Sequence, residues 1–233
     1  MIIKSSELER ILSAAQIKDL SKRAAEHFAK SADFNIYEDS DVEFKVVKLV
    51  DKDKNPIYFL VYQKIGTGSF GEVSRAIKLD IEHGTIASNI EVAIKVTDFT
   101  QGGTLGKTNI TFAKSVTAHE NNVLLRIQQS HGYSVGARKK RVPINLGDEL
   151  VMQEVEIQEA IVAMTLHSGN DIQHMAHKDK FSFGSIRFLE LASKFCTDLE
   201  QIHNKGVIHS DLKPANVIWD LENGLVNMGA APY

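Results

Sequence analysis

The segment His209–Asn216 carries the residue types in this chain that are best suited to chemistry. It reads His-Ser-Asp-Leu-Lys-Pro-Ala-Asn and follows the apolar pair Val207-Ile208. Asp211 can accept the proton of a hydroxyl nucleophile, and Lys213 can hold a phosphoryl group during its transfer. Asn216 can offer a neutral oxygen to a metal ion. This order of side chains predicts phosphoryl transfer to a hydroxyl group.

A glycine-rich segment, Gly66–Val73, is the second candidate. It reads Gly-Thr-Gly-Ser-Phe-Gly-Glu-Val. Glycines let backbone N–H groups approach phosphates without side chains in the way. The pattern G-x-G-x-x-G also occurs in dinucleotide-binding folds, where it opens a helix. Residues 72–79 alternate as a strand would, which favours a hairpin over phosphates, and a glycine turn without a ligand is the alternative.

A lysine ends an otherwise apolar strand. The run Val92-Ala93-Ile94-Lys95 places a cation beside buried positions, and such a cation usually needs an anionic partner. Glu120 lies in a segment of helical periodicity over residues 108–130, beside the apolar residues of its inner face. The sequence therefore predicts an ion pair between Lys95 and Glu120, and a solvated lysine at the strand end is the alternative.

With these three elements in this order, the sequence resembles the eukaryotic-type protein kinase family from about Ile57 to its last residue. The resemblance implies ATP and Mg²⁺ as cofactors and a protein substrate whose Ser or Thr receives the γ-phosphoryl group. Lys213 favours the Ser/Thr class over tyrosine kinases and small-molecule kinases. A small-molecule kinase is a weaker alternative.

The resemblance also implies roles for single residues. Four are expected to act in catalysis: Asp211 as the base, Lys213 beside the phosphoryl group, Lys95 on the α- and β-phosphates, and Glu120 as the partner of Lys95. Nucleotide binding is expected at Gly66, Gly68, Ser69, Gly71, Val73, Ala93, Lys95, Met164 and Ile218. Magnesium binding is expected at Asn216 and Asn227.

Two departures from the family pattern bear on activity. Ser210 stands where the family usually has Arg, so activation by phosphorylation of a loop is not expected. Asn227 stands where the D-F-G motif has its metal-binding Asp, and a neutral amide weakens the binding of Mg²⁺. Four residues follow Gly229. Three explanations stay open: a fragment, a pseudokinase that serves as a scaffold for a partner protein, or a minimal kinase like certain bacterial effectors.

Hydrophobic periodicity predicts the elements that position these residues. Helices are expected over residues 5–31 (with a capping box of Ser6 and Glu9), 108–130 and 185–204. Strands are expected over residues 42–50, 57–65, 72–79, 91–96, 142–146, 157–166, 216–219 and 224–226. With the resemblance, this order predicts an α+β, bilobal, protein-kinase-like fold. Its parts are an N-terminal helix and strand extension (1–56), a five-stranded antiparallel N-lobe with one αC helix (57–166), and an incomplete, mainly helical C-lobe (167–233).

Composition supports an ordinary globular protein. The chain has 233 residues, 43% of them hydrophobic and 24% charged, which excludes disorder and coiled coil. A net charge of −3 argues against a general nucleic-acid or membrane-surface binder. No apolar run approaches the roughly 18 residues that a membrane helix needs. The expected location is the cytoplasm, or the host cytosol for a secreted bacterial effector.

Three further features receive structural interpretations. Cys196 is the single cysteine and is expected to be buried in the helix over residues 185–204. Arg138–Arg141 is expected to be a solvated loop between two elements. Gly102–Thr108 resembles a Walker A loop, but Gln101 occupies its first glycine position, so a connection between a strand and a helix is expected.

Overall fold

The computed structural model describes residues 12–31, 35–68, 71–99, 109–146, 149–167, 170–173, 186–208, 212–219 and 226–228. These residues fall into two compact units. The described residues of the sheet unit lie within 2–118 and 130–165, and those of the helical unit lie within 119–129 and 166–233. The fold is α+β, as predicted, and the strand pairs of the described part are antiparallel.

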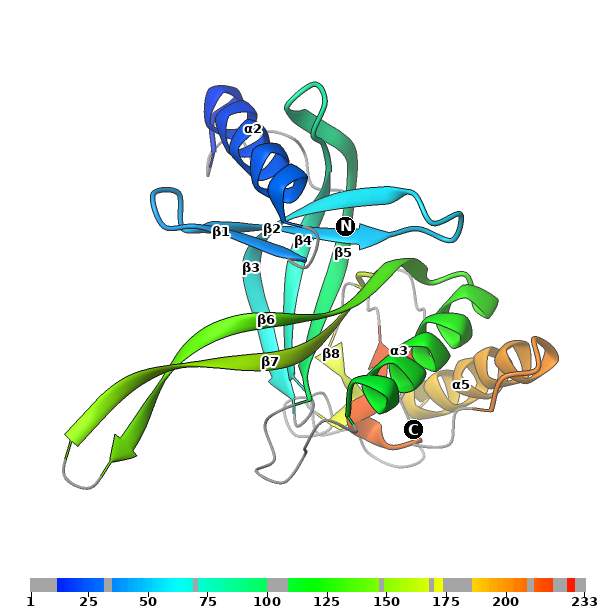
Figure 1. Cartoon of the computed structure of the whole chain (residues 1–233). Helices are drawn as coiled ribbons and strands as arrows, with labels where there is room; N and C mark the ends of the chain where they lie inside the picture. The colour runs from blue at the N-terminus through cyan, green and yellow to red at the C-terminus, as the bar shows by residue number, and fades with distance from the viewer. Residues whose placement is uncertain are drawn as a thin grey trace. The chain divides into compact units, whose positions relative to one another are not determined.

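The sheet unit contains the helix α2 (Ala14–Lys30) and seven strands. The strands are β1 (Ile36–Asp39), β2 (Phe44–Val50), β3 (Pro56–Gly68), β4 (Gly71–Asp80), β5 (Thr85–Asp98), β6 (Ser130–Leu146) and β7 (Glu149–Thr165). Their order is β1-β2-β3-β4-β5-β7-β6 (Figure 1). The last five form the antiparallel sheet that the sequence predicts, and β1 and β2 add two strands at its edge.

The sheet closes into a ring because β2 also pairs with β6. Val50 on β2 lies opposite Tyr133 on β6. Gly132 permits this approach, since its φ is +148° and a Cβ built on it would lie 2.9 Å from the carbonyl oxygen of Val50. Any other residue would meet the neighbouring strand and would adopt a conformation that L side chains avoid. Glycine is therefore needed where the ring closes.

Alternating apolar residues build one core inside this ring. Because side chains of a strand alternate between its faces, every second residue points to the same side. The buried side chains of this core are Ile36, Val47, Leu49, Ile57, Phe59, Val61, Ala76, Val92, Ile94, Ile161 and Ala163. This core fixes which face of each strand is left for the candidate site.

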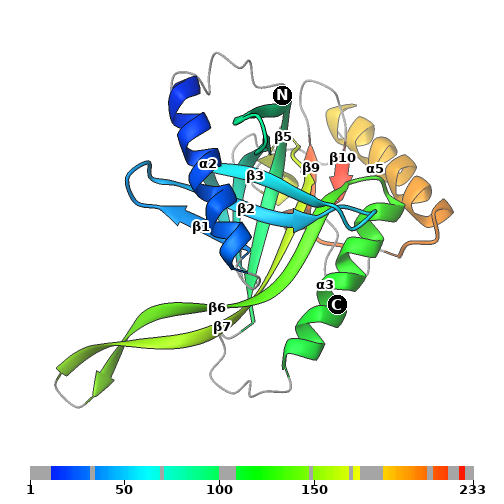
Figure 2. The same cartoon turned by 45° about the horizontal axis from the view of Figure 1, so that its top comes forward.

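The helix α2 covers a second core on the opposite face of the strands (Figure 2). Its buried residues recur at helical spacing. They pack on the strand residues that alternate with those of the first core and point to the other side of the sheet. The helix contributes Ile17, Leu20, Ala24 and Phe28, and the strands contribute Val46, Leu60, Ile77 and Leu79. Burial of each large side chain stabilises the fold by about 1.5–3 kcal/mol. The N-terminal segment is thus an integral part of the sheet unit.

The start of α2 differs from the prediction. The helix begins at Ala14, with Ser13 as its N-cap. Ser13 Oγ accepts from the Gln16 N–H at 3.3 Å, and Gln16 Oε1 accepts from the Ser13 N–H at 2.9 Å. The predicted start at residue 5 is therefore wrong, because this reciprocal capping box starts the helix later. The predicted box of Ser6 and Glu9 lies outside the described residues.

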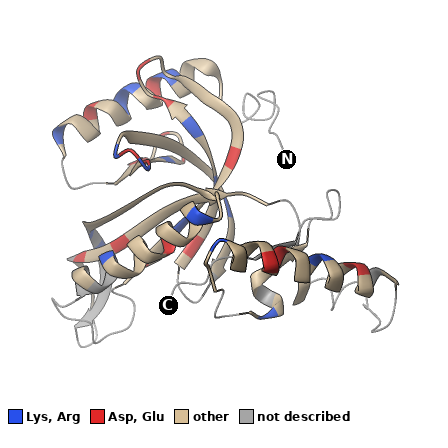
Figure 3. Cartoon of the chain, turned by 90° about the vertical axis from the view of Figure 1, so that its right-hand side faces the viewer, with Lys and Arg blue, Asp and Glu red and all other residues tan. Residues whose placement is uncertain are grey.

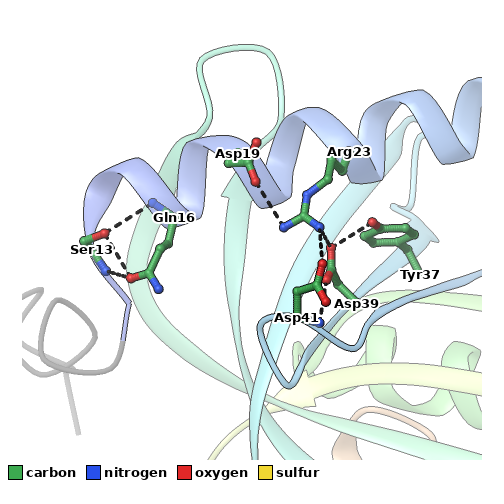
Figure 4. Close-up of polar contacts among 7 residues, drawn as sticks. All are labelled: Ser13, Gln16, Asp19, Arg23, Tyr37, Asp39 and Asp41. Carbon is green, nitrogen blue, oxygen red and sulfur yellow. Dashed lines mark hydrogen bonds and ion pairs between the residues drawn. The ribbon is translucent and has the colours of Figure 1, made fainter.

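A buried carboxylate joins α2 to β1. The side chain of Asp39 on β1 is 3% exposed and forms an ion pair with Arg23 of α2 (Figure 4). Tyr37 Oη donates to Asp39 Oδ2 at 2.9 Å, and Asp19 binds the same guanidinium at 3.0 Å. Such a buried carboxylate needs these partners. They attach the helix to the strand at a fixed position.

The strands β6 and β7 form a long hairpin that extends beyond the rest of the sheet (Figure 1). Arg138–Arg141 lies within β6, so the predicted loop is wrong. Its residues pair in register with β7, where Lys139 stands opposite Glu156 and Arg141 opposite Glu154. Lys139 Nζ also lies 3.0 Å from Glu154 Oε1. These cross-strand charge pairs let a basic run form a strand.

The helical unit contains the helix α5 (Ile186–Asn204), the one-turn helix η1 (Pro214–Asn216) and a small sheet of order β10-β9-β8. Its strands are β8 (Asn170–Asp171), β9 (Val217–Trp219) and β10 (Val226–Met228). Leu191 of α5 and Val217 of β9 form its core, with five half-buried neighbours: Ile172, Phe195, Leu199, Ile202 and Trp219. The remaining helix, α3 (Asn109–Arg126), has residues in both units.

Cys196 is exposed, so its predicted burial is wrong. The buried stripe of α5 follows Leu191, Phe195 and Leu199 at a spacing of four residues, and Cys196 lies outside it.

Acidic and basic residues are interspersed along α2 and α5, as on ordinary solvated helix faces (Figure 3).

Candidate functional site

The glycine-rich segment forms the hairpin that joins β3 to β4. Gly66 pairs with Val73 and Gly68 pairs with Gly71, so strand and not helix follows the glycines. This confirms the predicted hairpin. Ser69 lies outside the described residues.

The glycines at the two ends of this hairpin have different roles. A Cβ built on Gly66 would meet nothing within 4 Å, so the space beside it is open to a ligand. Gly71 has a φ of +142°, and its Cβ would lie 1.9 Å from the carbonyl oxygen of Val96. Gly71 is therefore required by the backbone of β5, and Gly66 leaves room for a group such as a phosphate.

The predicted nucleotide-binding residues of the sheet unit share one face. Val73 stands opposite both Gly66 and Lys95, and Ala93 stands opposite Met164. Because Ala93 and Lys95 are two residues apart on β5, their side chains point to the same side. The register thus brings together three apolar side chains, an open glycine and one cation.

This face fits an adenine nucleotide. Ala93 is small and 6% exposed, and Val73 and Met164 are half-buried beside it. Ala93 and Met164 offer apolar surface for a base, while Val73 lies in the next row, opposite Gly66 and Lys95, where phosphates would extend. The arrangement can therefore hold a planar ring at one end and negative charge at the other.

Glu120 is buried, which confirms that it lies on the inner, buried face of its helix. It is 5% exposed and lies on α3 between two other buried polar residues, Thr117 and Asn121. Lys95 belongs to the sheet unit and Glu120 to the helical unit. Their ion pair stays a prediction.

The segment with the predicted catalytic base is described from Leu212 onward. Lys213 is exposed, has extended backbone angles and is the N-cap of η1. Pro214 is at the helix start, and the Asn216 N–H donates to the Lys213 carbonyl at 2.9 Å. The turn therefore holds Lys213 and Asn216 close together. Asp211 lies outside the described residues, and its role stays a prediction.

The small sheet of the helical unit brings two further predicted residues together. Ile218 on β9 stands opposite Asn227 on β10 and opposite Asp171 on β8. Asp171 adds a carboxylate to this row, and the sequence reasoning missed it. A strand of two residues has no periodicity that could have revealed its place.

The predicted magnesium ligands are both neutral. Mg²⁺ prefers carboxylate oxygens, and Asn216 and Asn227 offer amide oxygens only. The described residues contain no group of three or more His, Cys, Asp or Glu side chains placed to hold a metal ion. By themselves, the described donors do not fit Mg²⁺.

A charge cluster beside the glycine hairpin was also missed by the sequence reasoning. Lys64 Nζ donates to Glu72 Oε2 at 2.8 Å, and Lys45 Nζ lies 3.7 Å from Glu72 Oε1. Ser74 Oγ donates to the same carboxylate at 3.3 Å. The hydrogen bond from Lys64, aided by the charge of Lys45, lowers the pKa of Glu72 below its ordinary value. Glu72 is therefore ionised at neutral pH.

The described helices include none with the length and apolar character needed to cross a membrane.

The chain is similar to known proteins over most of its length. Residues 59–229 match the protein kinase domain family. Serine/threonine-protein kinase PKH3 of Eremothecium gossypii is 25% identical over 184 residues, which are 78% of this chain and 22% of that protein. Ribosomal protein S6 kinase 2 alpha of Xenopus laevis is 25% identical over 174 residues, 73% of this chain and 19% of that protein.

A shorter match has higher identity. Serine/threonine-protein kinase PknD of Chlamydia trachomatis is 48% identical over 48 residues, which are 20% of this chain and 5% of that protein. The chain spans about a fifth of the length of the two relatives with the longer matches.

Proposed function

The chain belongs to the protein kinase domain family, and from this premise we propose that it is an ATP-dependent protein kinase acting on Ser or Thr. The observation that carries the proposal is the register that aligns Gly66, Val73 and Lys95 across three strands. Named serine/threonine kinases among its relatives support the choice of hydroxyl acceptor. Catalysis then consists of positioning and electrostatic stabilisation.

Each residue of the sheet face has a proposed task. Ala93, Val73 and Met164 hold the adenine ring by apolar contact. The backbone around Gly66, Gly68 and Gly71 covers the phosphates, and Lys95 neutralises their charge. ATP supplies the γ-phosphoryl group.

The acceptor side of the reaction is assigned to the helical unit. Asp211 orients the Ser or Thr hydroxyl and accepts its proton. Lys213 stabilises the charge on the phosphoryl group during transfer, and Ile218 contributes to adenine binding. Asn216 and Asn227 would contact Mg²⁺ only through neutral amide oxygens, so no step of the reaction is assigned to the ion.

A scaffold that binds a partner protein with weak or no catalysis is the second candidate. The neutral Asn227 favours it, because loss of a carboxylate weakens the binding of a hard divalent ion. Both candidates predict a folded chain, but they differ in phosphoryl transfer.

The deciding experiment is transfer of labelled phosphate from [γ-³²P]ATP to degenerate peptides that contain Ser, Thr or Tyr as the single acceptor. Label on the Ser and Thr peptides is expected. Binding is measured in parallel by thermal unfolding with Mg-ATP, where ligand at a hundredfold excess over Kd adds about 2.7 kcal/mol. A thermal shift without transfer would favour the scaffold, and the absence of both would contradict the kinase assignment.

A further inference from the structure

We infer that Lys45 is a positioning residue for the glycine hairpin, and that through it the segment Ala14–Val50 holds Gly66–Val73 ready for nucleotide phosphates. This segment, called the N-terminal extension below, lies before the family match that begins at residue 59. The inference rests on the proposed function, because it assigns the hairpin to phosphates.

The contact that carries the inference joins β2 to β4 across β3. Lys45 Nζ lies 3.7 Å from Glu72 Oε1, and Glu72 directly follows Gly71. Both side chains are only partly exposed, Lys45 by 27% and Glu72 by 36%. Solvent therefore screens the pair less than it screens a fully exposed one.

The register explains why these two side chains meet. Lys45 stands opposite Val61, and Val61 stands opposite Ala76. Val61 and Ala76 belong to the core inside the ring, so Lys45 points to that same side. Glu72 is four residues before Ala76 on β4 and shares its face. The ion pair thus lies at the hairpin end of the ring core.

Of the two lysines that contact Glu72, Lys45 alone lies outside the hairpin strands. Lys64 is on β3 and moves with the hairpin, although its hydrogen bond to Glu72 is shorter. Lys45 is on β2, which pairs with β3 over Lys45–Val50 and with β6 at Val50. A tie from Lys45 therefore connects the hairpin to a separate part of the sheet.

The N-terminal extension is itself firmly held. Its helix packs on the second core, and the pair of Arg23 with the buried Asp39 fixes α2 to β1. The pKa of Glu72 is lowered, so both lysines bind an ionised carboxylate and their contacts are charge-assisted. A positioning residue requires a rigid support and a charged contact, and Lys45 has both.

The test uses the whole 233-residue chain and three variants. Lys45→Met removes the charge and keeps an apolar stem, and Lys45→Arg restores the charge. Lys52→Met removes an exposed lysine from the turn after β2 and is the matched control. Two quantities are measured: hydrogen exchange of the backbone amides without nucleotide, and the Kd of ATP.

Lys45→Met is expected to speed exchange within Gly66–Val73, with little change in the strands β5 and β7. It is also expected to raise the Kd of ATP by about two- to fivefold, the range for a partly exposed ion pair. Lys45→Arg and Lys52→Met are expected to match the wild type in both measurements.

Three results would overturn the inference: unchanged exchange in the hairpin, faster exchange throughout the sheet unit, or faster hairpin exchange with an unchanged Kd. The second result would make Lys45 a purely structural residue. If the wild type binds no ATP, the proposed function fails, and with it the phosphate role of the hairpin. Exchange then still decides whether Lys45 holds the hairpin in place.

Discussion

Val73 on β4 stands directly opposite Lys95 on β5, and Gly66 on β3 stands opposite Val73. One row across three strands therefore brings an open glycine, an apolar side chain and a cation together. These residues are separated in the sequence, and the antiparallel register makes them neighbours. The row is the strongest support for binding a nucleotide on this face.

The variant Lys95→Met is expected to abolish phosphoryl transfer and leave the fold intact. The substitution removes the charge assigned to the phosphates and keeps an apolar stem on β5. Peptide phosphorylation measures the loss, and thermal unfolding without nucleotide reports the fold. Lys78→Met, at an exposed position of β4, is the control that retains activity. Transfer by Lys95→Met at the wild-type rate would disprove the assignment of Lys95.

The variant Asp211→Ala is expected to lose catalysis and keep ATP binding. A general base that orients the acceptor hydroxyl acts in the transfer step. It is not expected to contact the adenine or the ribose of ATP. We expect a rate loss of at least about a hundredfold, measured on a Ser peptide. The ATP-induced shift in Tm is measured beside it. Loss of both activity and ATP binding would indicate a structural role for Asp211.

The variant Asn227→Asp tests whether a neutral amide limits activity. A carboxylate binds Mg²⁺ more strongly, so transfer at fixed Mg²⁺ is expected to rise by roughly tenfold or more. The Mg²⁺ concentration for half-maximal rate should fall as well. Asn204→Asp, at the exposed end of α5, introduces the same charge as a control. An unchanged, measurable rate would mean that other residues hold the metal.

The variant Gly132→Ala is expected to destabilise the sheet unit by about 1–3 kcal/mol. Its Cβ would lie 2.5 Å from Ile57 Cδ1 and 2.9 Å from the Val50 carbonyl oxygen, at a positive φ. Gly66→Ala is the matched control for stability, because a Cβ there meets nothing within 4 Å. Denaturant unfolding of both variants makes the comparison. Equal stability of the two would contradict the ring closure.

The turn between β4 and β5 predicts a pH dependence. His83 Nδ1 lies 2.7 Å from Asp80 Oδ2; this hydrogen bond and the charge of Asp80 raise the pKa of His83. The same hydrogen bond lowers the pKa of Asp80. The stabilisation is complete below the unfolded pKa of His, about 6.5, and is lost as the pH rises through the raised pKa of His83. It is also lost in acid, as the pH falls through the lowered pKa of Asp80.

The measurement is the difference in Tm between the wild type and His83→Gln across the pH range. This difference is expected to be largest at about pH 5–6 and to shrink toward pH 9. Asp80→Asn should lose the same pH dependence, and the double variant should show no further loss. A difference that is constant with pH would rule out the ion pair.

The sequence was sufficient to predict a helix or strand where its hydrophobic pattern repeats within a few residues. Alternation of apolar residues predicted the strands that became β3 and β4, and helical periodicity predicted α5. The hairpin was predictable because strand alternation follows its glycines directly. Motif spacing likewise predicted Lys95 on a strand and Glu120 on the buried face of a helix, and Lys95 lies within β5 and not at its end.

Features that depend on register could not be predicted. The basic run Arg138–Arg141 forms a strand because glutamates of β7 stand opposite it, and that partner is invisible in a local window. The contact of Lys45 with Glu72 requires knowing that β2 joins the sheet beside β3. Cys196 was misplaced because residues 188–199 are apolar on more than one side, which blurs the buried stripe.

The pairing of Val50 with Tyr133 has a consequence for how the chain folds. These residues are far apart in sequence, so joining them carries a loop-closure entropy that local hairpins avoid. The hairpins β3–β4 and β6–β7 are local and can form early, whereas β2, which already pairs with β1 and β3, meets β6 late. During synthesis, β2 leaves the ribosome long before β6 exists. The end of β2 that β1 does not cover, at Val50, then stays open to other chains until the ring closes, and that interval is the period of greatest aggregation risk.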